Sequence, residues 1–399
     1  MPEKLKRKIS RLSKEMKLLL EILKTDTNQN PLPNVTLDSE IDWNEFLALS
    51  KHHRIYPIIY SKLKKTGSES IPKSVIDSLH KSYLKNTFRM LDLSGEMENI
   101  CRLFYDHNIR TLLLKGPVLA AALYGDLSLR TSSDIDLLIP ITDLDKVDHL
   151  LKENGYEKND YIETVLNDWK WRHHHVTYLH SEKNLKVEIH WRLNPGPSKE
   201  PGFDELWKRR QKSTLTRFPI FLLGNEDLFL FLITHGARHG WSRLRWLLDI
   251  NQLSKQPLDW HKLITLLKEY HYLHIAGQTL LLASELLNTP LIRPFEPLLY
   301  KNRSLNLARD TLFYLEEKIN LHTEPIPSHV AKFHQKYLFS IMSFQQKGLY
   351  IMSLLFPYPI DTKTFPLPEP LHFMYFPLRP VLCLWRKTRG TRQLKGSLK

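Results

Sequence analysis

The chain is poor in cysteine, with only Cys101 and Cys383 among 399 residues. Two cysteines do not form the disulfide framework of a small secreted protein, and such scarcity is typical of a reducing compartment. The charged N-terminus contains no apolar signal core, and no run of about 18 uninterrupted apolar residues occurs. Neither a secretory leader nor a membrane-spanning helix is therefore expected, and these absences favour a cytoplasmic protein.

Internal repeats, zinc-finger spacings, aromatic RNA-binding motifs and KH-type loops are also missing from the sequence. The net charge is nevertheless +14 at pH 7, from 57 Lys and Arg against 43 Asp and Glu. This excess favours anionic partners such as nucleotides, RNA or lipid headgroups, although it can also serve solubility alone. Because no nucleic-acid motif accompanies the charge, a nucleic acid is not the expected main substrate.

Residues 112–139, in contrast, contain several side chains that are typical of an active site. Asp134 and Asp136 flank Ile135 and precede an apolar run. Because side chains alternate between the faces of a strand, both carboxylates would project from one face, about 7 Å apart. Such a pair repels unless a cation lies between the two charges, and hydrated Mg²⁺ is the usual cation. The alternative is an exposed strand face with two solvated acids.

The residues before this acid pair predict a phosphate site. An apolar stretch of strand length ends at Lys115-Gly116, and a helix is expected from Pro117 to Leu123, because proline suits the first helical position. A strand, a glycine turn and a helix N-terminus together bind anions through free N–H groups and the helix dipole. Lys115 and Arg130 add two positive charges. The segment thus offers what metal-assisted transfer from a nucleoside triphosphate requires.

A third acid comes from residues 185–191, whose alternation predicts a strand with Glu188 and His190 on one face. This strand is expected beside that of Asp134, with residues 174–180 as its hairpin partner. A further carboxylate often completes a two-metal site. The alternative is that Glu188 lies on the solvent-exposed face of this hairpin.

Together these motifs resemble the nucleotidyltransferase fold shared by DNA polymerase beta and kanamycin nucleotidyltransferase. More specifically, they are similar to a bacterial family of uncharacterised nucleotidyltransferases, and the resemblance covers roughly residues 40 to 386. The matching positions are Lys115-Gly116, Arg130, Asp134 to Leu138, Glu188 to Trp191, and His235, His239, Arg245 and Asp249.

The resemblance implies an enzyme of the phosphotransferase class that moves a nucleotidyl group from ATP or another nucleoside triphosphate to an unknown acceptor, a small molecule or a peptide. By resemblance, Asp134, Asp136 and Glu188 are catalytic residues of a two-Mg²⁺ site. Asp134 and Asp136 would hold the metal, and Glu188 would act as a metal ligand or as the general base for the acceptor. The other implied nucleotide contacts are Lys115, Gly116, Arg130, Ser132, Ser133, His239 and Asp249.

One departure from the superfamily is that its Gly-Ser turn is Gly116-Pro117 here, without a hydroxyl for phosphate. Lys115, Arg130 and Ser132 or Ser133 would then take over those contacts. Two alternatives share the same site: phosphoryl transfer, and a catalytically silent module that binds a nucleotide or a partner.

Two groups of histidines carry separate expectations. His235 and His239 have the spacing of a helical metal pair, but Gly236 and Gly240 weaken that helix, so structural or supporting histidines are expected. His173 to His175 are expected on a hairpin surface, with one of them facing the site as the alternative.

The sequence predicts an α+β fold in which a small mixed sheet is flanked by helical regions. The expected divisions are an N-terminal helical region (1–106), a catalytic core (107–195), a C-terminal helical domain (196–348), and a proline-rich aromatic arm with a basic tail (349–399). A helix over 144–153 is also expected within the core.

The two ends of the chain carry further expectations. Residues 3–25 are expected to form one amphipathic helix, followed by a linker over 28–37. Prolines are expected to interrupt residues 373–385. The amphipathic stripe and the basic aromatic arm are candidates for peripheral contact with an anionic membrane, although packing against the protein itself is the more usual role.

Overall fold

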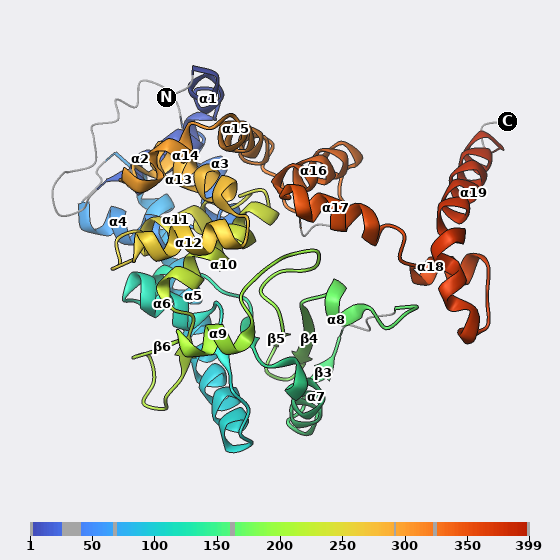
Figure 1. Ribbon diagram of the computed structural model, residues 1–399. Helices are drawn as coiled ribbons and strands as arrows, with labels where there is room; N and C mark the ends of the chain where they lie inside the picture. The colour runs from blue at the N-terminus through green and yellow to red at the C-terminus, as the bar shows by residue number, and fades with distance from the viewer. Residues whose placement is uncertain are drawn as a thin grey trace.

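The computed structural model describes residues 3–25, 41–66, 70–159, 164–290, 293–321 and 325–396. The predicted linker lies outside these ranges. Within them the fold is α+β, as predicted, with a seven-stranded mixed sheet below a larger body of helices (Figure 1).

The described N-terminal region is helical as far as the sheet. Its helices are α1 (Glu3–Ile9), α2 (Lys14–Lys24), α3 (Trp43–His52), α4 (Tyr56–Thr66) and α5 (Lys73–Asp106). The single helix predicted over residues 3–25 is wrong, because Ser13 caps the start of a new helix, α2. The apolar stripe itself is buried, at Leu5, Leu12 and Leu19 among others. These side chains pack within the protein and are not available to a membrane.

The sheet has the strand order β3-β4-β5-β2-β1-β7-β6. The predicted hairpin is confirmed, since β4 and β5 pair antiparallel, and β5 lies parallel to β2 with Asp136 opposite Glu188. Two short strands extend the sheet beyond residue 195, where the catalytic core was expected to end. The strands are β1 (Leu112–Leu113), β2 (Ile135–Leu138), β3 (Glu157–Lys158), β4 (His175–His180), β5 (Leu185–His190), β6 (Gln211–Lys212) and β7 (Phe221–Leu222).

Short helices connect these strands, and the predicted helices after Gly116 and over 144–153 are both confirmed. They are α6 (Pro117–Tyr124), η1 (Leu127–Leu129), η2 (Ile141–Asp143), α7 (Leu144–Glu153), α8 (Trp169–Arg172) and α9 (Phe203–Lys208).

The two faces of the sheet have different environments, as strand alternation requires. Ile135, Leu137, Val187 and Ile189 point into an apolar core that α5 and α7 complete. The opposite face carries the alternating polar residues of β2 and β5. This face is turned towards the following helices and forms one wall of the site.

The following helices form one body with the N-terminal ones. They are α10 (Asn225–Arg238), α11 (Leu244–Leu253), α12 (Trp260–Glu269), α13 (Leu273–Leu287), η3 (Arg293–Phe295), α14 (Glu296–Leu299), α15 (Asn302–Glu316) and α16 (Ser328–Ile341). Helices α1 and α2 contact α15 and α13, respectively, and their apolar residues share one cluster (Figure 1). The two predicted helical regions therefore pack as one layer over the sheet.

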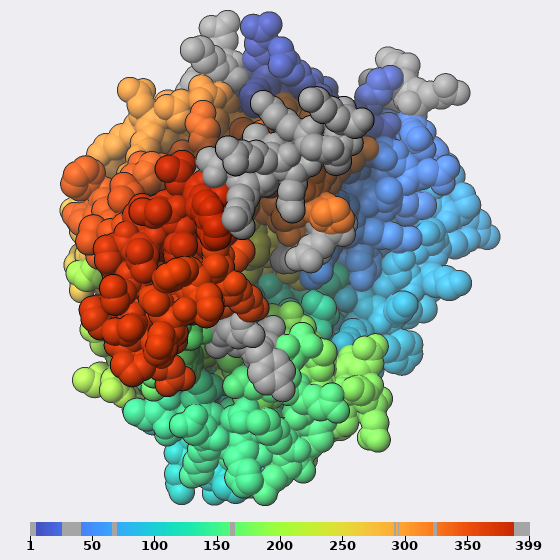
Figure 2. Space-filling view, turned by 90° about the vertical axis from the view of Figure 1, so that its right-hand side faces the viewer, coloured from blue at the N-terminus to red at the C-terminus, as the bar shows by residue number. Residues whose placement is uncertain are grey.

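The chain ends in an arm made of α17 (Phe344–Ser353), α18 (Pro359–Thr364), η4 (Glu369–Met374) and α19 (Tyr375–Gly396). The predicted interruption of residues 373–385 is wrong, because α19 continues through Pro380. In Figure 1, α18 and α19 stand away from the helical body, and Figure 2 shows the red arm across one face of the molecule. The arm contacts α8, where the Arg172 guanidinium lies 4.4 Å from the ring centroid of Tyr358.

Large apolar side chains of this arm are exposed, Phe344 and Leu384 among them. Among the described helices, none is both long enough and apolar enough to cross a membrane. Peripheral contact of the arm with a membrane surface stays a prediction.

Candidate active site

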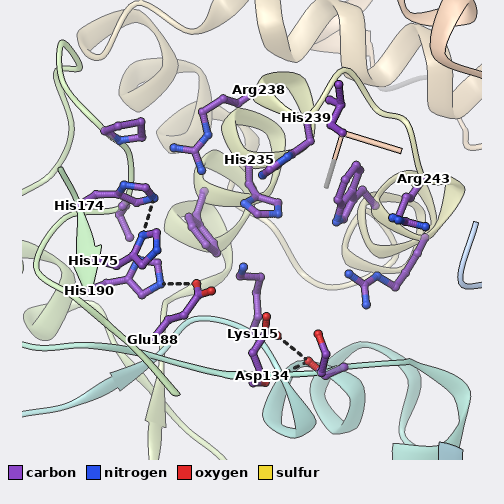
Figure 3. A pocket seen from close by; sticks show the side chains of 18 of the residues that line it. Lys115, Asp134, His174, His175, Glu188, His190, His235, Arg238, His239 and Arg243 are labelled. Atoms are coloured by element: carbon purple, nitrogen blue, oxygen red, sulfur yellow. Dashed lines mark hydrogen bonds and ion pairs between the residues drawn. The ribbon is translucent and has the colours of Figure 1, made fainter. Parts of the chain in front are cut away.

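A cavity of about 650 Å³ lies between the polar face of the sheet and helices α10 and α11 (Figure 3). Lys115, Asp134, Glu188 and His190 line it from the sheet. The residues that line it from the opposite, helical wall include Phe231, His235, Arg238, His239, Arg243, Arg245 and Trp246. The site is therefore built from two parts of the chain that are far apart in sequence.

The turn before α6 has the predicted geometry. Gly116 has a φ of 88° and caps α6, with Pro117 at the first helical position. A positive φ of this kind favours glycine, since a side chain would be strained there. Lys115, Ser132 and Ser133 line the cavity, whereas Gly116 is not at its wall. Gly116 thus shapes the turn, and its neighbours present the polar groups.

The three predicted acids occupy different positions. Asp136 is 0% exposed and lies directly opposite Glu188 in the β2–β5 ladder. Potential ligand atoms of Asp136, Glu188 and His190 all lie within 4.8 Å of one another. Asp134 is not part of this group: it precedes β2, and its Oδ1 accepts a 3.4 Å hydrogen bond from Ser132 Oγ. The fold brings two of the three acids together with a histidine and leaves Asp134 at the cavity wall.

Three basic side chains contact the paired acids, among them Lys186, whose Nζ lies 2.6 Å from Glu188 Oε1. Lys115 Nζ lies 3.0 Å from Asp136 Oδ1, and His190 Nε2 lies 3.2 Å from the same oxygen and 3.5 Å from Glu188 Oε2. Burial would raise the pKa of Asp136, but Lys115 and His190 outweigh it and lower that pKa. Burial likewise opposes ionisation of Glu188, yet the hydrogen bond from His190 leaves its pKa far below the ordinary value. Both carboxylates are therefore ionised at neutral pH.

The acid group also has an unsatisfied atom that fits a divalent cation. Asp136 Oδ2 is buried and makes no hydrogen bond to the described residues. A buried, ionised oxygen without a partner is costly, and a hard cation is one way to satisfy it. Glu188 supplies a second carboxylate beside it, so the residues present fit Mg²⁺.

Arg130 and Asp249, both predicted to contact nucleotide, instead pair with each other. Arg130 donates from Nε to Asp249 Oδ1 and from Nη2 to Oδ2, each at 3.0 Å. Asp249 is 0% exposed and also accepts a 2.8 Å hydrogen bond from the Tyr124 hydroxyl. The direct contact predicted for Asp249 does not match this position, because its carboxylate is already engaged behind the cavity wall. Arg130 does line the cavity, and its buried Nη1 has no hydrogen-bond partner among the described residues.

The arginines of the helical wall were largely missed by the sequence analysis, which noted only Arg245. Burial lowers the pKa of Arg245 to about 9, and those of Arg238 and Arg243 to about 10. Each remains a cation at neutral pH, at a cost in lost hydration. Arg238 Nη1 and Arg245 Nε have no hydrogen-bond partner among the described residues. The available signal was positive charge within the otherwise apolar residues 228–250, where a charged side chain is rarely buried without a function.

His235 and His239 lie together on the helical wall, as their spacing predicts. Their ring centroids are 4.6 Å apart, and both rings pack against Trp246. Burial lowers the pKa of His235, so its ring is neutral. Neither residue belongs to a potential metal-binding group within the described part of the chain. This packing agrees with the supporting role that we expected, and a nucleotide contact for His239 stays a prediction.

The hairpin surface predicted for the His173 to His175 run is wrong for two of its members. His174 and His175 line the cavity, because His175 is the cross-strand neighbour of His190 on the polar face of the sheet. Figure 3 shows both rings beside His190 and Glu188.

Comparison with protein families gives a match for this chain. A family model described as an uncharacterised nucleotidyltransferase matches residues 39–288, which include both walls of the cavity. Comparison with curated proteins and with solved structures gives no match.

Proposed function

The chain belongs to this nucleotidyltransferase family, and we propose that it transfers a nucleotidyl group from a nucleoside triphosphate, ATP in the first instance, to an acceptor oxygen. The proposal depends mainly on one observation. Two ionised carboxylates lie side by side in the β2–β5 ladder: Glu188 lines a cavity whose other wall is cationic, and Asp136 is buried directly beside it. A metal-bound triphosphate needs acids to bind its metal ion and cations to bind its phosphates.

In the proposed reaction, an oxygen of the acceptor forms a bond to the α-phosphorus, and the bond to the bridging oxygen of the leaving pyrophosphate breaks. A hydroxyl acceptor releases its proton to solvent, and pyrophosphate leaves the site. Mg²⁺ bound by Asp136 and Glu188, with Asp134 nearby, would supply charge neutralisation and orientation. Lys115 and Arg130 line the cavity and offset phosphate charge. Ser132 and Ser133 offer hydroxyls at the same wall.

The role of Glu188 follows from its electrostatics. A carboxylate whose pKa is held far below the ordinary range is a poor general base at neutral pH. Glu188 is therefore better suited to bind the metal ion and orient the acceptor than to remove its proton. This choice narrows the two roles that the resemblance left open.

The test uses purified protein, Mg²⁺, a cell extract as the source of acceptor, and ATP labelled at the α- or γ-phosphate. We expect transfer of the α-label, and its loss in Asp136→Asn and Glu188→Gln. Asp145→Asn is the matched control, since Asp145 is an exposed acid on α7. Transfer of the γ-label alone would overturn the proposal in favour of phosphoryl transfer. Bound nucleotide without any transfer would indicate a silent binding module.

A further inference from the structure

Three imidazoles gather where the β4–β5 hairpin meets the cavity. His175 and His190 are cross-strand partners, and His174 directly precedes β4. The ring centroids of His175 and His190 are 4.9 Å apart, and those of His174 and His190 are 5.5 Å apart. One ring nitrogen from each of the three lies within 4.8 Å of the others (Figure 3). The proposed transfer gives no role to His174 or His175.

His190 is oriented in the way that metal-ligating histidines usually are. Its Nε2 contacts the carboxylates of Asp136 and Glu188, so the proton of a neutral ring lies on Nε2. Its Nδ1 then carries a lone pair, and this atom is buried without a hydrogen-bond partner among the described residues. A histidine that binds a metal commonly donates its other N–H to a carboxylate, which fixes the tautomer. His190 therefore presents an unused ligand atom on a ring that is 3% exposed.

The other two rings already direct nitrogens at each other. His175 Nδ1 and His174 Nε2 are 3.1 Å apart, a separation at which one nitrogen donates to the other. Nitrogen ligands of a tetrahedral zinc ion lie about 2.0–2.1 Å from the metal, so small ring rotations would convert this contact into shared ligation. Both residues line the cavity, which provides an entry path for an ion.

We propose that His174, His175 and His190 bind a divalent transition metal ion of the zinc class, at a site next to the carboxylate Mg²⁺ site, whose two acids contact the other nitrogen of His190. Imidazole nitrogens favour zinc and related metals, whereas Mg²⁺ favours oxygen ligands. Three protein ligands leave a fourth position open, as in catalytic rather than structural zinc sites. That position would accept an oxygen or nitrogen of a molecule in the cavity, next to Glu188. The proposal concerns binding and does not require nucleotidyl transfer.

The test is metal binding by the full chain after treatment with a chelator. We expect one Zn²⁺ per chain, and X-ray absorption of the zinc-loaded wild-type protein should show three imidazole nitrogens at about 2.0–2.1 Å. His174→Ala and His175→Ala should each weaken zinc affinity by about 100-fold or more, since loss of a mere supporting partner already costs about 10–100-fold.

Two control variants separate this site from its surroundings. His173→Ala removes the neighbouring histidine, and Asp134→Asn removes an acid of the other site, and neither should change zinc affinity. Oxygen-only ligation in the wild-type spectrum would overturn the proposal even if a histidine variant failed to fold. Zinc affinity that falls in Asp134→Asn but persists in the double variant His174→Ala/His175→Ala would also overturn it. Labelled-ATP transfer with Mg²⁺ is measured in parallel, so that failure of the two proposals can be told apart.

Discussion

The two walls of the cavity differ in their charges: the sheet wall carries acids paired with basic side chains, whereas the described part of the helical wall carries arginines and histidines without acids. On the sheet wall, Asp136 is paired with Lys115 and His190, and the strand register holds it opposite Glu188. On the helical wall, the half-buried Arg238 and the buried Arg245 each have a buried nitrogen without a hydrogen-bond partner among the described residues. The acid pair of the sheet wall is thus preorganised for a small cation, whereas the arginines of the helical wall lack countercharges in the described ranges.

This difference assigns separate tasks to the walls. An acid pair at fixed separation suits a metal ion, which requires defined geometry. Desolvated arginines suit a large anion, because they regain favourable interactions only when an anion enters. We expect changes on the sheet wall to act mainly on kcat, and changes on the helical wall to act mainly on nucleotide affinity.

The largest effect is expected at Asp136. Replacing it by asparagine removes the buried charge that fits Mg²⁺, and metal ions contribute several kcal/mol of transition-state stabilisation. Nucleotidyl transfer should fall by about 10³-fold or more in kcat. The labelled-ATP assay measures this loss, with Asp145→Asn retaining wild-type rates and a thermal melt confirming the fold. If Asp136→Asn kept more than a tenth of the wild-type kcat, the expected role of the sheet wall in kcat would be wrong.

The next effect concerns the Arg130–Asp249 ion pair, which ties the two walls together. Asp249→Asn leaves a buried guanidinium without its countercharge, and breaking a buried pair costs about 3–5 kcal/mol. Urea unfolding measures this loss. Glu98→Gln is the matched control, since its pair with Arg102 is solvent-accessible and of the kind that contributes at most about 1 kcal/mol. Similar losses for both variants would show that the walls are not joined by this pair.

A smaller effect is expected on the helical wall. Arg238→Met removes a cation whose Nη1 has no hydrogen-bond partner among the described residues, and a hydrogen bond to a charged group contributes about 1.5–3 kcal/mol. The dissociation constant for ATP should rise by about 10-fold or more, with a smaller change in kcat. Equilibrium titration with ATP gives this value, and Arg309→Met on α15 is the control. A change confined to kcat would contradict the division of tasks.

The smallest effect is a pH dependence on the sheet wall. Burial alone lowers the pKa of His190, but its hydrogen bonds to Asp136 and Glu188 reverse this and raise it. A raised folded-state pKa gives stability that is complete below about pH 6.5, the unfolded value, and is lost as pH rises through the folded pKa. Unfolding free energy from pH 6 upward should decline more steeply in the wild type than in His190→Gln. If the unfolding free energies of the two proteins changed with pH in parallel, His190 would not be the cause of the pH dependence.

Local sequence patterns were sufficient to predict much of the sheet wall. Alternation along β5 predicted that Glu188 and His190 share a face, and Gly116-Pro117 predicted the turn before α6. Both depend on backbone geometry within a few residues, which the sequence encodes directly. Local patterns misled elsewhere: residues 3–25 form two helices, and Pro380 lies inside α19.

The sequence by itself determined the acids, the glycine turn and the strand face that Glu188 and His190 share, because each follows from the side-chain period of a strand or the conformational preference of one residue. Only the tertiary structure decided that Arg130 pairs with Asp249 and that His174 faces the cavity. It also decided which arginines are buried opposite the acids. Burial and charge pairing depend on elements such as β2 and α11, whose distance along the chain contains no information about their contact in space.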